Sequence, residues 1–457
     1  MTLQEERPVT RAAGPSGWFR AFWRWHFYAS FLVVPILLVL SVTGLIYLLR
    51  FQLEPLLHAD VMTVEQPADM DFTQPYDAQL KAVERDYPDA TVVSMAEPRD
   101  DSRSTVFSIV TADGGPREVF VNPWGAEVLG ELNPDTMLSG YAVRIHADLM
   151  AGTWGDRLIE LGVCWAIVMA LTGYYLFVKM RGMRKKRPKS LRSRHGRIGA
   201  FVGLALLFLM VSGLPWTGVW GEKAQQLATD RNTSMWSNDP GALSNPVSTL
   251  DESLPHSHQV PWGSGKSEVP KSGTAHQGAS VANVDTALQV ADGEGLRHPM
   301  TVALPAEEDG VYSVIGYAFD APSEEQTVHV GRFGGEVVST YGYDDYPALA
   351  KVVAQGIGLH EGRSLGTFSF WLSLLMCIGV MASCITGPLM WWRRRPAKQV
   401  GAPRGRMPIK ASPLLAVGLV ALGVFLPLFG ISLLVILLVD QVVVRRIPAL
   451  ARTFNSA

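Results

Sequence analysis

Long apolar runs alternate with polar segments along the chain, and their lengths predict how often it crosses a membrane. Four runs cover residues 27–49, 157–178, 198–220 and 368–392. About 20 apolar residues in a helix span the hydrocarbon core of a bilayer, so each run is long enough for one crossing. Long polar segments separate the first run from the second and the third from the fourth. The pattern predicts a polytopic α-helical membrane protein with a four-helix core and two soluble regions.

A last apolar block, residues 413–443, is interrupted at Pro427. As one straight helix it would be roughly 46 Å long, well beyond a hydrocarbon core of about 30 Å. Basic residues flank both of its ends, which favours an even number of crossings. We therefore expect a C-terminal transmembrane hairpin that turns near Pro427–Gly430, between a cytoplasmic linker (393–412) and a cytoplasmic tail (444–457).

The distribution of charge predicts which side of the membrane each segment faces. Residues 179–197 hold ten Lys or Arg and no acid, whereas residues 51–156 and 221–362 together hold 38 acids and 13 basic residues. Positive charge on short loops stays in the cytoplasm. A nucleic-acid patch is the alternative for the basic loop, but its place between two spans favours a topology signal in contact with anionic lipids.

This assignment places both soluble regions on the side of the membrane opposite to the basic loop, the periplasmic side. The expected order is cytoplasmic residues 1–26, a periplasmic domain at 58–145, the basic loop at 179–197, and a second periplasmic domain at 221–359. Residues 230–282 of the second domain are rich in Ser, Gly, Pro and Asn, and predict a flexible insertion in which His256 and His258 are solvated.

The first soluble region has the pattern of a small α+β domain. Helical spacing over Tyr76–Tyr87 precedes short β-rich runs at Thr91–Met95, Thr105–Thr111 and Glu118–Val121. A part of this pattern returns downstream. Residues 119–129 align without a gap with residues 328–338. The soluble part of the chain is therefore predicted to be duplicated.

The membrane part carries the same sign of duplication in the spacing of its histidines. His146 stands 26 and 27 residues before Thr172-Gly173, and His360 stands at the same intervals before Thr386-Gly387. Since both histidines directly precede a run that returns to the cytoplasm, both are expected at the periplasmic side.

A second recurrence involves the first and third runs. His26 stands 17 and 18 residues before Thr43-Gly44, and His195 stands equally far before Ser212-Gly213. Both histidines are expected at the cytoplasmic ends of their helices. Each face of the membrane would then present one pair of imidazoles.

Two imidazoles that face each other across a helix bundle are suited to bis-histidine haem ligation. We predict two haem groups, one ligated by His26 and His195 and the other by His146 and His360. A bare glycine lets a flat macrocycle approach the backbone. The predicted glycine contacts are Gly44 and Gly213 on the periplasmic face, and Gly173 and Gly387 on the cytoplasmic face, so that each face has two histidines from one helix pair and two glycines from the other.

Two alternatives were weighed against haem. Histidine is common at membrane interfaces, but Trp, Tyr or Arg would serve equally well there. A lone metal ion is disfavoured because each face offers two imidazoles without a carboxylate or thiolate partner in the repeat. Because the chain has no Cys-x-x-Cys-His motif, the haem is expected to be non-covalent and b-type.

Several of these residues also define a resemblance. Arg24-Trp25-His26 opens the first run, Asn122–Leu129 reads as a closing hairpin, and His146 and His360 precede the second and fourth runs. On these motifs the chain resembles the PepSY-associated transmembrane-helix family, which includes iron-regulated membrane proteins of the PiuB and FoxB kind. The resemblance covers about residues 18–395.

The resemblance implies an inner-membrane haem protein that reduces ferric siderophores, or other ferric chelates, on the periplasmic side. Nothing in the sequence resembles a nucleotide or flavin site, so a quinol or a cytoplasmic reductase would supply the electrons. No acid–base catalytic group and no nucleic-acid partner are expected. The alternatives are a non-redox, membrane-tethered PepSY binding or inhibitory module, and a transporter built on repeated helix pairs. Transport is disfavoured because the runs contain few charged residues.

Overall fold

A computed structural model describes most of the chain. The described residues are 17–231, 269–273, 280–305, 309–316, 321–395, 400 and 413–454. Most of the predicted insertion 230–282, with His256 and His258, lies outside the described residues, and so does most of the predicted linker 393–412.

The chain divides into two compact units. The first comprises Met1–Leu38, Leu158–Met210 and Gly379–Ala457, and the second comprises Val39–Arg157 and Val211–Ile378. Four of the long helices, α1, α6, α8 and α13, contribute segments to both units, whereas every strand that the structure describes belongs to the second.

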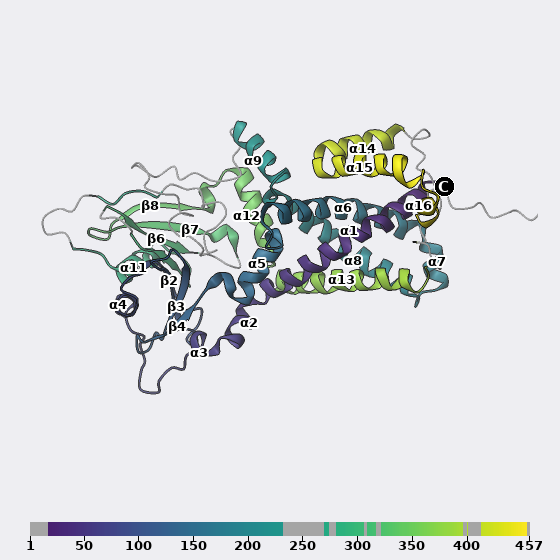
Figure 1. The fold of residues 1–457 in the computed structure, drawn as a ribbon. Helices are drawn as coiled ribbons and strands as arrows, with labels where there is room; N and C mark the ends of the chain where they lie inside the picture. Colours follow the sequence, from purple (N-terminus) through teal and green to yellow (C-terminus); the bar gives the residue numbers. More distant parts are fainter. Residues whose placement is uncertain are drawn as a thin grey trace, which may run out of the picture. The chain divides into compact units, whose positions relative to one another are not determined.

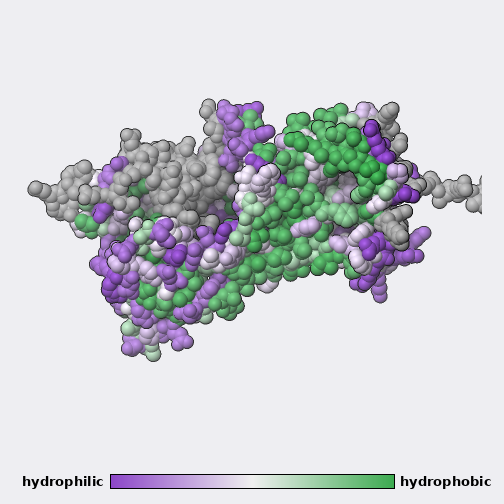
Figure 2. Space-filling model, viewed as in Figure 1, coloured by the Kyte–Doolittle hydropathy of each residue, from purple (hydrophilic) through white to green (hydrophobic). Residues whose placement is uncertain are grey.

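Five helices of the described chain are long and apolar enough to cross a membrane (Figure 1). Hydrophobic side chains cover much of the surface of these helices (Figure 2). The spans are α1 (Gly17–Leu48), α6 (Gly152–Lys179), α8 with the 3-10 turn η2 (Leu191–Trp216), α13 (Thr367–Trp392), and α15 with a π-helical turn (Pro427–Val444). Together they define a multi-pass membrane protein, as the hydropathy pattern predicts.

Helix α1 begins ten residues earlier than the predicted span, so His26 lies inside the helix and not ahead of it. The extension carries aromatic residues one helical turn apart, which stabilise a helix through contacts of their side chains. The rings of Trp18 and Phe22 have centroids 5.6 Å apart, and those of Phe19 and Trp23 are 5.7 Å apart.

The C-terminal apolar block forms two helices, α14 (Pro413–Phe425) and α15 (Pro427–Val439), which lie side by side in Figure 1. The chain turns at Leu426, just before the predicted position, and Pro427 opens the second helix, where its missing N–H is not needed. Helices α14 and α15 are in close contact at Gly423 and Gly430. A Cβ on Gly430 would stand only 2.6 Å from the carbonyl oxygen of Gly423.

Eight strands form one antiparallel sheet in the second unit, in the order β4-β3-β2-β1-β5-β6-β7-β8. The strands are β1 (Thr91–Ala96), β2 (Thr105–Val110), β3 (Pro116–Val121), β4 (Val128–Leu132), β5 (Thr301–Ala303), β6 (Val311–Gly316), β7 (Gln326–Gly331) and β8 (Val337–Gly342). Each predicted soluble domain contributes four consecutive strands as a meander.

The two predicted domains are therefore halves of one sheet, which corrects the expectation of two separate domains. Strands β1 and β5 join the halves, with Ser94 opposite Ala303 and Ala96 opposite Thr301. An isolated half would present an open edge of unpaired backbone groups at this strand, and pairing with the other half satisfies them.

Helices α4 (Tyr76–Asp86) and α11 (Val284–Gly293) pack on the sheet, one from each half. Val83 of α4 and Ala287 of α11 are fully buried in a common core with side chains of the strands. The helices are also linked directly, because the carboxylate of Asp285 accepts hydrogen bonds from the backbone N–H groups of Tyr76 and Asp77, at 2.8 and 2.9 Å.

The hairpins that close the two halves correspond in detail. Strand pair β3–β4 has a bulge directly after Phe120, and β7–β8 has one directly after His329. The turn bond from Asn122 N to Glu127 O in the first hairpin has its counterpart from Gly331 N to Glu336 O in the second. The equivalent positions in the two hairpins are those that the gapless alignment of residues 119–129 with residues 328–338 pairs.

Beyond each closing hairpin, a helix carries one of the predicted ligands. Helix α5 (Leu138–Asp148) follows β4 and has His146 in its last turn, and α12 (Ala348–His360) follows β8 and ends at His360. The remaining short helices include α2 (Arg50–Leu57), α3 (Ala59–Met62), α7 (Arg181–Lys186), α9 (Trp220–Asp230) and α16 (Pro448–Thr453).

Candidate functional site

The first pair of predicted ligands, His26 on α1 and His195 on α8, lies within the first unit. Their ring centroids are 6.5 Å apart and the ring planes are inclined by 76°. Two residues that are 169 positions apart in the sequence are therefore neighbours, as the spacing argument predicts for one face of the core.

Each ring of the first pair is oriented by a hydrogen bond at Nδ1. His26 Nδ1 donates to the carbonyl oxygen of Met169 at 2.9 Å, and His195 Nδ1 lies 3.1 Å from the hydroxyl of Thr386. The Thr386 hydroxyl donates its own proton to the carbonyl of Ala382 at 2.7 Å, so it accepts from the imidazole. Both imidazoles therefore carry their proton on Nδ1, which makes Nε2 the nitrogen that can bind a metal.

The second pair, His146 on α5 and His360 on α12, lies within the second unit. The ring centroids are again 6.5 Å apart, with the planes inclined by 86°. His146 Nδ1 lies 2.9 Å from the hydroxyl of Thr43, and His360 Nδ1 lies 2.8 Å from that of Ser212. Since the Thr43 hydroxyl donates to backbone carbonyls of its own helix, it accepts from the imidazole here too.

Burial keeps the second pair neutral. It lowers the pKa of His360 to about 4, and burial together with the neighbouring His360 lowers the pKa of His146 to about 4. A metal-binding imidazole must be neutral, so both rings are in the binding form at neutral pH.

All four predicted glycines lie against these rings. A Cβ would stand 3.0 Å from His26 Cε1 if built on Gly173, and 3.7 Å from His195 Cε1 if built on Gly387. In the second unit, Gly44 and Gly213 would each place a Cβ 3.6 Å from Cε1 of His146 and His360, respectively. The glycines thus make room for the imidazoles, whereas the sequence argument assigned them to contact with a macrocycle.

Each histidine meets a glycine on a different helix from its own. The sequence intervals link His26 to Gly44 along α1, but the glycine that touches His26 is Gly173 on α6. Likewise His146 touches Gly44 and not Gly173. Each recurring interval therefore separates a histidine and a glycine on one segment of the chain. The histidine belongs to one pair of imidazoles, and the glycine contacts the other pair.

The hydroxyl of the residue before the glycine is the feature that sequence reasoning missed. Thr43, Ser212 and Thr386 each orient one imidazole, and each directly precedes one of the four glycines. The signal was present, because Thr or Ser recurs at this position in every repeat. Thr172, the fourth, bonds to carbonyls of its own helix while His26 uses the Met169 carbonyl directly.

Both pairs fit a single metal atom between two imidazoles. At about 2.0 Å per metal–nitrogen bond and roughly 1.2 Å from nitrogen to ring centre, such rings have centroids about 6.4 Å apart. Both observed separations are 6.5 Å. In the described part of the chain no group of three or more His, Cys, Asp or Glu could hold a metal ion. Two axial imidazoles with no further ligand suit haem iron, whose porphyrin supplies the other donors.

One aromatic residue adjoins the second pair. The indole of Trp216, at the end of η2, has its centroid 6.2 Å from that of His360, and its side chain is 44 % exposed. It is the counterpart of Tyr47 in the other repeat, since each stands three residues after the glycine that faces a histidine.

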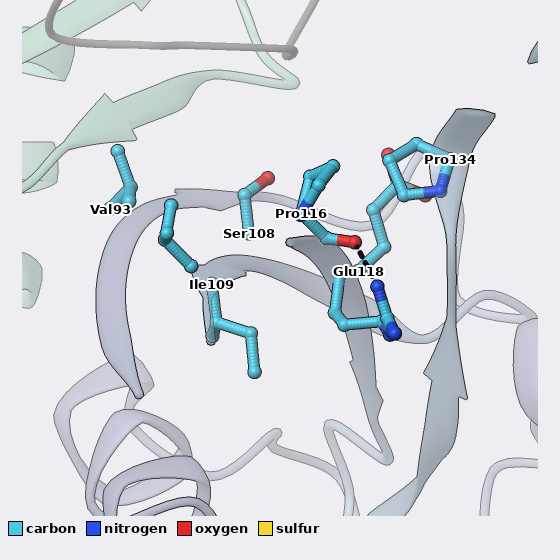
Figure 3. Close-up of a pocket in the computed structure, with 8 residues that line it drawn as sticks. Val93, Ser108, Ile109, Pro116, Glu118 and Pro134 are labelled. Atoms are coloured by element: carbon cyan, nitrogen blue, oxygen red, sulfur yellow. Dashed lines mark hydrogen bonds between the residues drawn. The ribbon is translucent and has the colours of Figure 1, made fainter. Parts of the chain in front are cut away.

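A shallow hollow on the sheet is separate from both pairs. Its lining includes Val93, Ser108 and Glu118 (Figure 3). Burial, together with the charge of Glu54, raises the pKa of Glu118 to about 7. The polar side chains of the lining are those of Ser108, Arg117 and Glu118, so the hollow offers a single carboxyl and no set of ligands for a metal.

The apolar helices, the strand-rich unit and the paired histidines define a multi-pass membrane protein with a folded antiparallel-sheet domain. The chain belongs to the family described as the PepSY-associated TM region, whose model matches residues 23–394. The match confirms the family resemblance, while the iron-regulated PiuB and FoxB subgroup stays a prediction. No curated protein matches the chain significantly.

Proposed function

We propose that this protein is an inner-membrane b-type haem protein that passes single electrons across the membrane to ferric chelates, ferric siderophores above all. The observation that carries the proposal is the shared geometry of the two histidine pairs. In each pair the rings are spaced for one metal atom, and in all four rings Nδ1 is engaged by a hydrogen-bond partner.

The residues of the two sites would act by binding and orienting. His26 with His195, and His146 with His360, would be the axial ligands, and haem iron supplies a one-electron carrier when bound. The hydroxyls and the carbonyl at Nδ1 hold each ring in place and make the imidazole a stronger ligand. The glycines let the backbone come close to the rings.

The direction of transfer is inferred from charge. The ten basic residues of 179–197 favour a cytoplasmic position for the loop before His195. The first pair would then receive electrons from a quinol or a cytoplasmic reductase, and the second pair would deliver them in the periplasm. The overall change is transfer of one electron from the donor to the Fe(III) of the chelate. The resulting Fe(II) binds hard oxygen ligands less tightly than Fe(III) does.

The sheet limits where the chelate can bind. Because β1 and β5 are paired, a chelate cannot sit in a gap between two separate domains, and it would have to lie on a face or edge of the sheet. The 38 acidic and 13 basic residues of the soluble regions favour cationic or neutral chelates. The half-exposed Trp216 offers a contact surface next to His360.

A redox difference spectrum of the purified protein tests the proposal. Protein expressed with ample haem should show the spectrum of b-type haem with two nitrogen ligands when dithionite-reduced and oxidised samples are compared. A folded, colourless protein would reject the haem function and leave the non-redox binding module as the better account.

A further inference from the structure

Helix α5 presents His146 from its last turn, but the first turn of this helix has no cap of its own. The helix begins after Met137, whose side chain makes no capping hydrogen bond. The first N–H groups of a helix have no partner within it and need an acceptor from elsewhere.

Glu54 supplies one acceptor from a distant part of the sequence. Its Oε1 accepts a hydrogen bond from the backbone N–H of Ser139 at 2.5 Å, and the side chain is only 5 % exposed. A carboxylate at this end of the helix also interacts favourably with the helix dipole. Glu54 therefore acts as an external cap for the helix that carries His146.

The continuous segment formed by α1 and α2 makes hydrogen bonds with both the first turn and the last turn of α5. Glu54 belongs to α2, which follows α1 after Leu49, and the N–H of Leu53 bonds back to the Leu49 carbonyl at 2.9 Å. At the other end of α5, the hydroxyl of Thr43 in α1 bonds to His146 Nδ1. Two contacts, seven residues apart on α5, thus fix the helix along its length.

We propose that Glu54 is a positioning residue for His146, which sets the orientation of α5 and thereby the geometry of the second histidine pair. The capping contact is independent of haem, whereas the effect on a bound haem rests on the proposed function. With only Thr43 in place, α5 could pivot about one point, and the His146 ring would lose its defined angle to His360.

Two other titratable groups face Glu54. His58 Nε2 lies 3.7 Å from Glu54 Oε2, and the charge of Glu54 acts on Glu118. A substitution that keeps an oxygen acceptor but removes the charge therefore separates the two roles of Glu54, capping and electrostatics.

The test compares three variants of the full-length, haem-loaded protein. Glu54→Leu fills the space but removes the acceptor, Glu54→Gln keeps an amide oxygen for Ser139, and Glu84→Gln on the exposed face of α4 is the control. The measurements are the EPR spectrum of the oxidised haems, the midpoint potential of each, and hydrogen exchange of residues 138–148.

Glu54→Leu should speed exchange in α5 about tenfold, as expected for loss of a hydrogen bond to a charged group. It should also shift the EPR signal of the His146/His360 haem and leave that of the His26/His195 haem unchanged. Glu54→Gln should restore the EPR signal but raise the potential of the same haem, because a negative charge that favours ferric iron is lost.

Normal EPR and exchange in Glu54→Leu would overturn the inference while the haem function stands. If the wild type binds no haem, the proposed function fails, and the exchange experiment alone judges the cap: faster exchange supports it, and unchanged exchange rejects it. If Glu54→Leu does not fold, Glu54→Ala decides, since this change also removes the acceptor for Ser139, and an EPR spectrum and an exchange rate equal to those of the control would reject the role.

Discussion

Gly173 lies against the imidazole of His26, and a Cβ on this glycine would stand 3.0 Å from Cε1 of the ring. The equivalent separation between Gly387 and His195 is 3.7 Å, an ordinary contact. One pair of ligands thus contains one glycine that cannot be replaced without movement and one that can, which supplies a matched pair of variants.

Gly173→Ala should displace His26 and weaken the haem of the first pair. Extra volume at a well-packed position costs about 1–3 kcal/mol. Gly387→Ala should leave haem content close to that of the wild type. Haem content per protein, measured by pyridine haemochromogen, compares the two, and equal loss in both would contradict the difference in packing.

Thr386→Val should raise the midpoint potential of the first haem. Without the hydroxyl acceptor, Nδ1 of His195 loses its hydrogen bond, the imidazole becomes a weaker donor, and ferric iron is less stabilised. Thr386→Ser should restore the wild-type potential. Thr43→Val is the control, because its hydroxyl bonds to His146 of the second pair. A potentiometric titration that finds the same shift of the first haem in Thr43→Val would reject this role of the hydroxyl.

His146→Ala should remove about half of the haem absorbance and spare the remainder, because each pair binds one group. His26→Ala should remove the other half, and the double variant should be colourless. His329→Ala is the control, since His329 is buried in the sheet beside Ser313, away from both pairs. Complete loss of haem in His146→Ala alone would indicate one shared site in place of two.

Reporter fusions test the predicted topology. Fusions at Arg103 and Ser253 should be active only in the periplasm, and a fusion within residues 179–197 should be active only in the cytoplasm. The reason is the concentration of basic residues in that short loop. A cytoplasmic signal at either soluble position would reverse the inferred direction of electron transfer.

Reduced protein mixed anaerobically with a ferric hydroxamate should be reoxidised, and the haem spectrum follows the reaction. Trp216→Ala should slow reoxidation without changing the potential of either haem, because the indole lies beside His360 and is not a ligand. Trp220→Ala, on the following helix α9, is the comparison. A reduced haem that does not react with any ferric chelate would exclude iron reduction while leaving the haem assignment intact.

The sequence by itself determined the spans and the candidate ligands. A bilayer imposes a minimum apolar length on every crossing helix, so hydropathy alone places α13 within one residue, and α6 and α8 within seven residues. The duplication made the histidine positions visible as repeated intervals, and the closing hairpins agree with the alignment down to the bulges after Phe120 and His329.

Tertiary structure alone decided which single glycine each histidine meets. The predicted topology puts Gly44 and Gly213 on the face of His146 and His360, but it does not say which of the two contacts His146. An interval along one helix carries no information about individual contacts between helices. The pairing of β1 with β5, which joins the two halves, could not be predicted from the sequence either. The pattern of residues in a strand indicates which face is buried, but it does not indicate which other strand pairs with its edge. The contact from Glu54 to Ser139 depends on α2 and α5 lying side by side, and no local signal in the sequence marks a carboxylate that caps a helix 85 residues away.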